Sequence, residues 1–169
     1  MKDDLVHTVL LVEDAPCCRQ YASYLSDLRN VDTLDLKQAT VSKIKPYAVI
    51  LFIVTAPVTG NMEAPALLSR CVRLLDPDTH RLGLLTVGLM PDDQAPSLLG
   101  EFDQIPLFYA RSDWKPSEFT WQDQMTVSLW KKAGTVPEWM KPLLASQGGQ
   151  NFASPANLDP VLDLIDGRL

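Results

Sequence analysis

The residues with the clearest chemical potential lie together in one short loop near the start of the chain. Glu13 and Asp14 supply two carboxylates, Cys17 and Cys18 supply two adjacent thiols, and Arg19 supplies a cation. A thiol at the start of a helix has a lowered pKa, which favours thiolate chemistry. Adjacent cysteines can close only a strained ring, however. We therefore interpret the pair as small residues at a helix start rather than as a redox couple.

The other polar residues do not match the pattern of a metal site. The three cysteines and two histidines are not at the spacing of zinc ligands, and the odd number of cysteines argues against a disulfide framework. Asp92 and Asp93 could transfer protons or bind an ion, but a solvated acidic loop is the simpler interpretation. Free thiols are typical of a reducing compartment, so we expect a cytoplasmic protein.

Charge and length narrow the class of protein further. The 169 residues fit one domain, 1–169, and the net charge of −6 argues against binding to nucleic acid or to an anionic lipid surface. No apolar stretch approaches the roughly 20 residues that a membrane span needs, and the first residues are too acidic for a signal peptide. We expect no nucleic-acid partner and no membrane insertion.

Four short apolar runs and one segment of alternating apolar and polar residues, 31–36, predict strands, and segments with helical spacing separate them. The predicted strands cover residues 7–12, 31–36, 47–54, 82–87 and 106–109. Helices are predicted to follow Pro16, to cover residues 67–75 and to cover residues 95–102. The run at 47–54 is the most apolar, so it should lie in the centre of the sheet. This alternation is typical of a parallel sheet that helices cover on both faces.

The last third of the chain is less regular. We expect a helix within 117–132, a flexible link at about 146–154 and a final amphipathic helix over 158–169. Several aromatic residues in this region could form a partner surface, although at least half of them should belong to the core. They are Trp114, Phe119, Trp121, Trp130 and Trp139.

The segment after the central predicted strand carries a resemblance to a known family. It reads Val54-Thr55-Ala56-Pro57-Val58-Thr59-Gly60-Asn61-Met62 and resembles the second flavin loop of the flavodoxin family. The resemblance implies a flavodoxin-like three-layer sandwich, an α/β fold with a doubly wound, five-stranded parallel sheet in the order 2-1-3-4-5. The ligand site of such a sheet lies where the first and third strands end.

Much of the remaining chain is similar to one branch of that family, typified by menaquinone-dependent protoporphyrinogen oxidase. The run Phe108-Tyr109-Ala110-Arg111 resembles an aromatic loop of that branch, and Trp121-Gln122-Asp123-Gln124-Met125 resembles its W-x-D-x-x-M-like helix start. The predicted helix at 158–169 stands where the branch has its last helix. The matches occur in the same order over nearly the whole chain.

The resemblance implies FMN as a cofactor, held by loops at 13–19, 55–62 and 88–93. The implied cofactor contacts are Arg19, Thr55, Ala56, Pro57, Val58, Thr59, Gly60, Asn61, Gly88 and Leu89. In the loop at 55–62, Pro57 would fix the shape of the turn, and Gly60 would let the backbone approach a flat ring. Thr59 departs from the family, because many flavodoxins place an aromatic side chain there to stack on the flavin.

The first loop departs further from the family pattern. Flavodoxins hold the flavin phosphate with hydroxyls and backbone N–H groups, whereas residues 13–19 contain no Ser, Thr or Gly. Glu13 and Asp14 would repel a phosphate by about 1 kcal/mol per exposed pair. Pro16 removes an N–H donor, and Arg19 is the one cation of the loop that could contact a phosphate.

A second family shares this fold and part of this pattern. The start Leu10-Leu11-Val12-Glu13-Asp14 and the later pair Lys115-Pro116 resemble a response-regulator receiver. A receiver needs a phosphorylatable Asp at the end of the third strand, where this chain has Ile53-Val54-Thr55. This position excludes phosphotransfer of the receiver type.

Two functional hypotheses follow from the sequence. In the first, the chain is a flavodoxin-like FMN-dependent electron carrier or oxidoreductase, in which the flavin performs the chemistry. In the second, it is a degenerate flavodoxin-like domain that has lost FMN and acts as a non-enzymatic binding or assembly module. The candidate partners are a redox or other protein partner and a second copy of the chain as a homodimer.

Overall fold

Five parallel strands form the centre of the protein. The computed structural model describes residues 7–94, 97–99, 105–146 and 148–169. Their strands in the main sheet are β1 (Thr8–Val12), β2 (Asp32–Asp35), β3 (Val49–Thr55), β5 (Arg81–Gly88) and β7 (Leu107–Arg111), in the order β2-β1-β3-β5-β7. Counted along this sheet alone, the order is 2-1-3-4-5, which confirms the predicted α/β fold.

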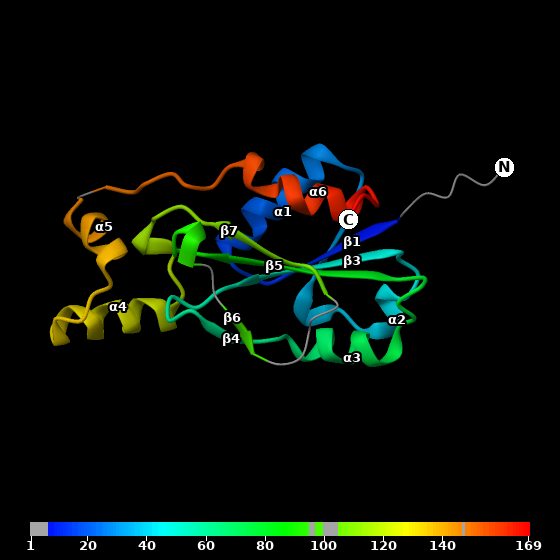
Figure 1. Cartoon of the computed structure of the whole chain (residues 1–169), viewed down its shortest axis with the longest axis horizontal. Coiled ribbons are helices and arrows are strands. Elements are labelled where there is room, and N and C mark those ends of the chain that lie inside the picture. The colour runs from blue at the N-terminus through cyan, green and yellow to red at the C-terminus, as the bar shows by residue number, and fades with distance from the viewer. Residues whose placement is uncertain (1–6, 95–96, 100–104, 147) are drawn as a thin grey trace.

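Helices cover both faces of this sheet, so the protein has three layers (Figure 1). One face carries α1 (Pro16–Leu28) and α6 (Asp159–Ile165), and the other carries α2 (Val41–Ile44) and α3 (Ala66–Leu74). Each face has its own apolar core, because alternate residues of β1 and β3 point to opposite sides. β3 is buried along six of its seven residues, as expected for the central strand.

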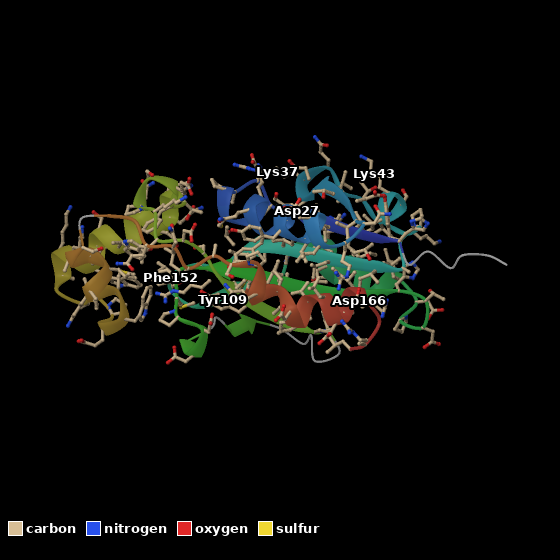
Figure 2. All side chains as sticks on the ribbon, turned by 90° about the horizontal axis from the view of Figure 1, so that it is seen from above. Asp27, Lys37, Lys43, Tyr109, Phe152 and Asp166 are labelled. Atoms are coloured by element: carbon tan, nitrogen blue, oxygen red, sulfur yellow. The ribbon has the colours of Figure 1, made fainter. Side chains whose placement is uncertain are left out.

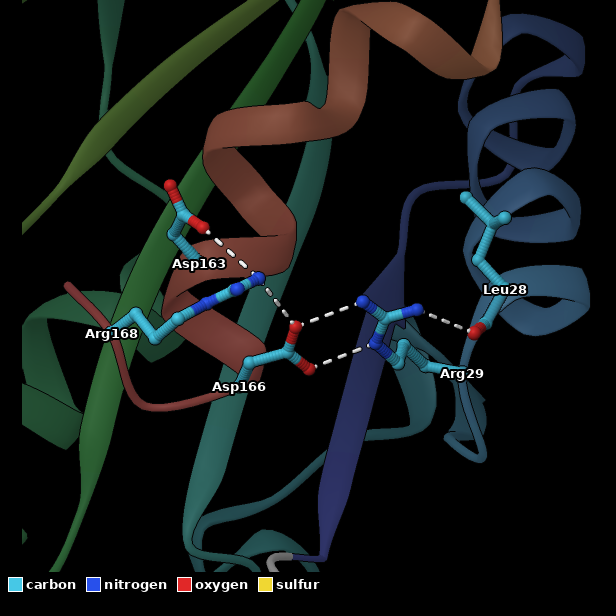
Figure 3. A network of polar contacts seen from close by, with 5 residues as sticks. All are labelled: Leu28, Arg29, Asp163, Asp166 and Arg168. Carbon is cyan, nitrogen blue, oxygen red and sulfur yellow. Dashed lines mark hydrogen bonds and ion pairs between the residues drawn. The ribbon is translucent and has the colours of Figure 1, made fainter.

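An ion-pair network joins the two helices on the first face (Figure 3). Arg29, directly after α1, donates two 2.8 Å hydrogen bonds to the carboxylate of Asp166, directly after α6. Arg168 also contacts Asp166, at 3.0 Å. The Arg29 guanidinium holds the pKa of the Asp166 carboxyl below its ordinary value. The network attaches the last helix to the first.

One predicted helix is a strand where the structure describes it. Residues 97–99 of the helix expected at 95–102 form β6 (Ser97–Leu99), which pairs in parallel with β4 (Asn61–Glu63). The rest of that prediction lies outside the described residues. Backbone pairing with β4 satisfies peptide groups that a short, proline-interrupted helix would leave open. The helix prediction fails over residues 97–99 because these residues pair with a strand that is distant in the sequence.

Residues 112–154 form a separate layer beyond the carboxyl ends of the strands, which we call the cap (Figure 1). The cap contains α4 (Trp121–Ala133) and α5 (Lys141–Ala145). Thr120 begins α4 by accepting a hydrogen bond from the Asp123 backbone N–H, and Gly134, at φ +68°, ends it. Short 3₁₀ helices cover Pro116–Glu118 and Glu138–Met140 here, and Leu36–Gln38, Asp92–Gln94 and Pro155–Leu158 elsewhere.

The second half of the segment expected as a flexible link makes hydrogen bonds to residues that closely follow β7. Gln150 exchanges two backbone hydrogen bonds with Trp114, at 2.8 and 3.0 Å. One carboxylate oxygen of Asp113 accepts the backbone N–H groups of Phe152 and Ala153, each at 2.8 Å. These bonds lie where the chain returns from the cap toward α6. The sequence gives little sign of this, because a remote side chain supplies the acceptors.

None of the helices in the described residues is both long enough and apolar enough to cross a bilayer. Within the same residues, His, Cys, Asp and Glu side chains form no group of three or more that could hold a metal ion.

Candidate functional site

The candidate site lies where β1, β3, β5 and β7 end and the cap begins. Parallel strands bring their following loops to one edge of the sheet, and ligands of doubly wound folds gather at this edge. A cavity of about 190 Å³ is enclosed there by the start of α1, by the loops after β3 and β5, and by the first part of the cap. The predicted flavin loops therefore do meet.

Glu13 bridges the ends of the first and third strands. One of its carboxylate oxygens accepts the Thr55 backbone N–H at 2.6 Å and the Thr55 hydroxyl at 2.7 Å. The Glu13 backbone N–H donates to the Ile53 carbonyl at 2.9 Å. Both polar groups of Thr55 that could face a ligand are thus bound to a carboxylate of the first loop.

Asp123 binds the same flavin-like loop from the cap side. Its Oδ1 atom accepts the Val58 backbone N–H at 3.1 Å, and only 7% of the residue is exposed. Burial raises the pKa of the Asp123 carboxyl, and the hydrogen bond from Val58 partly opposes this. The Asp123 carboxylate therefore links α4 to the loop that follows β3 through a hydrogen bond.

Two other backbone donors of this loop also have partners within the chain. The Ala56 N–H donates to the Val87 carbonyl at 2.8 Å, and the Gly60 N–H donates to the Pro57 carbonyl at 3.0 Å. Together with Thr55 and Val58, four amides of the predicted cofactor loop are therefore saturated internally. A flavin ring would have to displace protein acceptors to use them.

Two residues predicted to contact the cofactor pack in an apolar core beneath the cap, and one of them, Leu89, also borders the 190 Å³ cavity. Val58 and Leu89 are 4% and 6% exposed. They pack in a cluster with four residues of the cap, namely Trp114, Val127, Met140 and Leu143. Trp114 also packs edge-on against Phe119 and Trp139, with ring centroids 4.9 and 6.5 Å apart. The core of the cap thus packs directly against the flavin-like loops.

Gly88 packs closely against protein and leaves no space beside it for a ring. A Cβ at Gly88 would lie 3.0 Å from the Ala56 Cβ and 3.1 Å from the Tyr109 hydroxyl. Gly60 has φ +96°, a conformation that favours glycine, and closes the turn that begins at Pro57. Thr59 is exposed beside it, and Asn61 begins β4.

The loop after β5 is fixed by residues of β7. The Tyr109 hydroxyl donates to the Met90 carbonyl at 2.7 Å, and Arg111 Nε donates to the Leu89 carbonyl at 3.2 Å. The Arg111 guanidinium stacks 3.6 Å above the ring centre of Phe152. Figure 2 shows Tyr109 and Phe152 toward the cap end of the molecule. Through Arg111, these contacts connect the third predicted flavin loop, 88–93, to Phe152.

Arg19 does not point to the cavity where a phosphate was predicted. It forms an ion pair with Asp14, and its side chain is about half exposed. Both residues line a different hollow, together with Thr33 and Asp35 near β2. The one cation of the first loop is thus engaged with one of that loop's own carboxylates.

The residues present do not fit the phosphate of FMN. Four carboxylates line the 190 Å³ cavity, from Asp14, Asp113, Glu118 and Asp123, against the single cation Lys115. The cavity is also smaller than the roughly 300–1,000 Å³ of usual ligand pockets. A wider groove of about 570 Å³ runs along the other side of Thr55 and Ala56. Glu13, Glu63 and Asp123 contribute to its wall, and no Lys or Arg does among the described residues.

The adjacent thiols differ in environment. Cys18 is fully buried, whereas Cys17 is partly exposed and lines the cavity. Contact with Cys18, helped by the Cys18 backbone N–H, lowers the pKa of the Cys17 thiol. That same contact and burial raise the pKa of the Cys18 thiol. Both are free thiols, so the pair is no disulfide.

The five aromatic residues predicted as a partner surface differ in how far they are buried. Trp114 is buried, and Phe119, Trp130 and Trp139 are half-buried against the same core, so most of the group belongs to the interior. Trp121 is the exception, with 66% exposed. Sequence reasoning missed Asp113 and Asp123 as internal acceptors. The W-x-D motif did mark Asp123, but only as part of a resemblance.

Comparison of the chain with protein-family models, with curated proteins and with solved structures finds no match. The strand order of the main sheet is consistent with a flavodoxin-like three-layer sandwich.

Proposed function

We propose that this chain is a flavodoxin-like domain that works without FMN, as a non-enzymatic binding or assembly module. The observation that carries the proposal is the use of the predicted flavin loop by the protein itself. Glu13 and Asp123, from opposite sides, bind the Thr55 and Val58 amides. The loop that would hold a flavin instead joins the main sheet to the cap.

Displacing the cap would have a substantial energetic cost. A flavin ring against the loop after β3 would expose Val58 and Leu89, which pack against the cap. Losing the burial of one such side chain costs about 1.5–3 kcal/mol. Asp123 would also lose its bond to Val58, and the loop amide would need a new partner. Binding of FMN would have to offset all of these terms.

Charge acts in the same direction. A phosphate dianion near the start of α1 would meet Glu13 and Asp14, while Arg19 is already paired with Asp14. Within a partly buried cavity, like charges repel more strongly than in bulk water. The FMN-dependent electron carrier or oxidoreductase therefore stays as the competing prediction, and it requires both the cap and the first loop to rearrange.

A titration of the purified protein with FMN tests the proposal. We expect a colourless protein, with no absorbance at roughly 350–500 nm, and no change of flavin fluorescence at tens of micromolar FMN. A yellow preparation, or saturable quenching in that range, would contradict the proposal and favour the FMN-dependent function.

A charge-removing variant separates the two obstacles to FMN. Glu13→Gln keeps an oxygen acceptor for the Thr55 N–H but removes one carboxylate. We expect this variant to bind no FMN either, because the cap still covers Val58 and Leu89. If Glu13→Gln gains FMN binding, charge alone excludes the cofactor and the cap does not.

A further inference from the structure

A further cavity lies at the amino ends of β5 and β7, at the end of the sheet opposite the cap (Figure 1). Its volume is about 290 Å³, close to the roughly 300 Å³ at which usual ligand pockets begin. Val72 of α3 and Leu75 directly after it form part of the wall, and Leu164 of α6 forms another part. The cavity shares no lining residue with the two cavities of the candidate site.

The walls of this cavity also differ in charge from those near the cap. Carboxylates line both cavities of the candidate site, whereas no Asp or Glu side chain lines this one among the described residues. Aliphatic and proline side chains form the walls, apart from His80 and Arg81. In a chain with a net charge of −6, this cavity is therefore a local exception. Such a lining favours an apolar ligand that carries negative charge.

Arg81 supplies the positive charge of the cavity. It is the first residue of β5 and is half-buried. Its guanidinium lies over Gly167, where a Cβ would come within 2.8 Å of Nη1. Gly167 has φ +78°, a conformation that favours glycine. The turn after α6 thus leaves room for the guanidinium at the edge of the cavity.

The guanidinium of Arg81 has no carboxylate partner in the described part of the chain. Arg19, Arg29 and Arg168 each form an ion pair with an aspartate, but Arg81 takes part in none. A half-buried guanidinium gains from an anionic acceptor, because a charge-assisted hydrogen bond is roughly twice as strong as a neutral one. The planar fork of arginine also matches the two oxygens of a carboxylate.

His80, the other polar residue of the wall, is already engaged by the protein. Its Nε2 atom lies 2.8 Å from the Lys45 carbonyl oxygen, and its Nδ1 atom lies 2.9 Å from the Thr79 hydroxyl. Both ring nitrogens thus have partners before any ligand arrives. Arg81 is therefore the group of the described wall that would bind an anion.

Parts of the apolar wall are still in contact with water. Val72 and Leu169 both line the cavity, and they are 45% and 61% exposed. An apolar ligand would remove some of this aliphatic surface from water, which favours binding. The cavity thus offers an apolar surface and one cation to the same ligand.

We propose that this cavity binds a small apolar carboxylate, with the carboxylate on the Arg81 guanidinium and the apolar body against the aliphatic walls. At about 30 Å³ for each water-sized group, the volume corresponds to a ligand of on the order of ten non-hydrogen atoms. Such a ligand should have a Kd on the order of 1 mM. The inference goes beyond the proposed function, because it names a ligand class for the end of the sheet opposite the predicted flavin site.

Octanoate is the probe, because it combines one carboxylate with an apolar chain and has about ten non-hydrogen atoms. The full chain is titrated with up to about 10 mM octanoate and followed by ¹H–¹⁵N NMR. We expect saturable shifts of the Leu82 and Ile105 amides. Octanol and octylammonium have the same chain without the negative charge, so they should bind at least about fivefold more weakly. No saturable shift, shifts confined to the Thr55 and Val58 amides, or equal affinity for octanol overturns the proposal.

Arg81→Met tests the role of the guanidinium, because it keeps an unbranched apolar stem and removes the charge. Octanoate should bind at least about tenfold more weakly to this variant, with octanol binding unchanged. Arg70→Met is the matched control. Arg70 is exposed on α3, two residues before Val72 and thus about 200° around the helix from it. An equal loss of octanoate binding in both variants, or no loss in Arg81→Met, overturns the assignment to Arg81.

Val72→Glu tests the position of the ligand without changing Arg81. It places a carboxylate in the wall at a partly exposed position, so the fold should tolerate it. Octanoate binding should weaken at least about tenfold, and octylammonium binding should not. Leu74→Glu adds the same charge on α3 outside the cavity lining and should leave the Kd unchanged. Unchanged octanoate binding by Val72→Glu overturns the proposal. Circular dichroism checks the fold of each variant.

The outcome is distinguishable from that of the FMN titration, because the two ligands are tested at opposite ends of the sheet. A chain that binds neither FMN nor octanoate would remove the carboxylate site and leave the cofactor-free proposal standing. A chain that binds both would support the carboxylate site and contradict the cofactor-free proposal.

Discussion

The main sheet and the cap are held together in different ways. The sheet is stabilised by long apolar strands that are buried on both faces, such as β1 and β3. The cap is attached by one small apolar core and by a few polar bonds, such as the one that Asp123 accepts from the Val58 N–H. Many apolar contacts thus stabilise the sheet, whereas only a few contacts hold the cap to it. The region that decides what the site can bind is the more easily altered of the two.

A change in the centre of the sheet should have the largest effect and should be global. Phe52 is fully buried in β3, and Phe52→Ala should lower the free energy of unfolding by about 3–5 kcal/mol. That is a large fraction of the 5–15 kcal/mol typical of a whole domain. Urea unfolding, followed by far-UV circular dichroism and by tryptophan fluorescence, measures it. The two signals should shift together. Separate transitions would show that the sheet and the cap unfold independently.

A change in the core of the cap should have a smaller, local effect. Trp114 is 2% exposed and touches the rings of Phe119 and Trp139. Trp114→Ala should reduce stability by about 3 kcal/mol, the lower end of the range for such truncations, and loosen the cap while the sheet persists. Limited proteolysis should then cut within residues 112–154 before it cuts the sheet. Equal protection of the cap in variant and wild type would contradict the view of a weakly held cap.

The Asp123 bond should contribute less than Trp114. Asp123→Ala leaves the Val58 N–H without its acceptor, which costs about 1–3 kcal/mol. Asp123→Asn is the matched control, because its amide oxygen can accept the same hydrogen bond. Thermal unfolding of both variants measures the difference. A loss as large in Asp123→Asn as in Asp123→Ala would show that the carboxylate charge matters more than the hydrogen bond.

The same residue gives a pH dependence with a definite sign. Burial raises the pKa of the Asp123 carboxyl above its value in the unfolded chain. Its contribution to stability is therefore fully present below the unfolded pKa and is lost as the pH rises through the folded pKa. Asp123→Asn has no such titration, so it should gain stability relative to wild type over this pH rise. A constant difference between the two proteins from acid to neutral pH would contradict the raised pKa.

The smallest expected effect is chemical rather than energetic. Cys17 borders the cavity and has the lowered pKa, whereas Cys18 and Cys71 are buried. Iodoacetamide should therefore modify Cys17 first, and peptide mass mapping identifies the modified residue. Cys17→Ser is the control, and it should remove the fast phase. Modification of Cys71 at the same rate would show that α3 opens as readily as the cavity.

The sheet could be predicted because its signals are local and strong. Apolar runs such as 47–54 are buried on both faces, and the alternation with helices restricts the topology. The helix expected at 95–102 was wrong over Ser97–Leu99 because pairing with β4 is a non-local contact. Local spacing contains no information about such a partner.

The candidate site could be predicted only in part, for the same reason. The loops at 13–19, 55–62 and 88–93 do meet at one edge of the sheet, as parallel strands require. What fills the edge comes from far along the chain: Asp123 lies 65 residues after Val58, and Asp113 lies 39 residues before Phe152. An acidic residue in a helix does not show from its sequence whether it faces solvent or a distant amide.

The most direct test of the central account is the hydrogen exchange of two amides, measured by NMR with and without excess FMN. Glu13 accepts the Thr55 N–H and Asp123 accepts the Val58 N–H. We predict that both amides are protected without FMN and that excess FMN changes neither their exchange rates nor their chemical shifts. Rapid exchange of both amides without FMN, followed by protection when FMN is added, would contradict the account. It would show that these amides become hydrogen-bonded only when the cofactor binds.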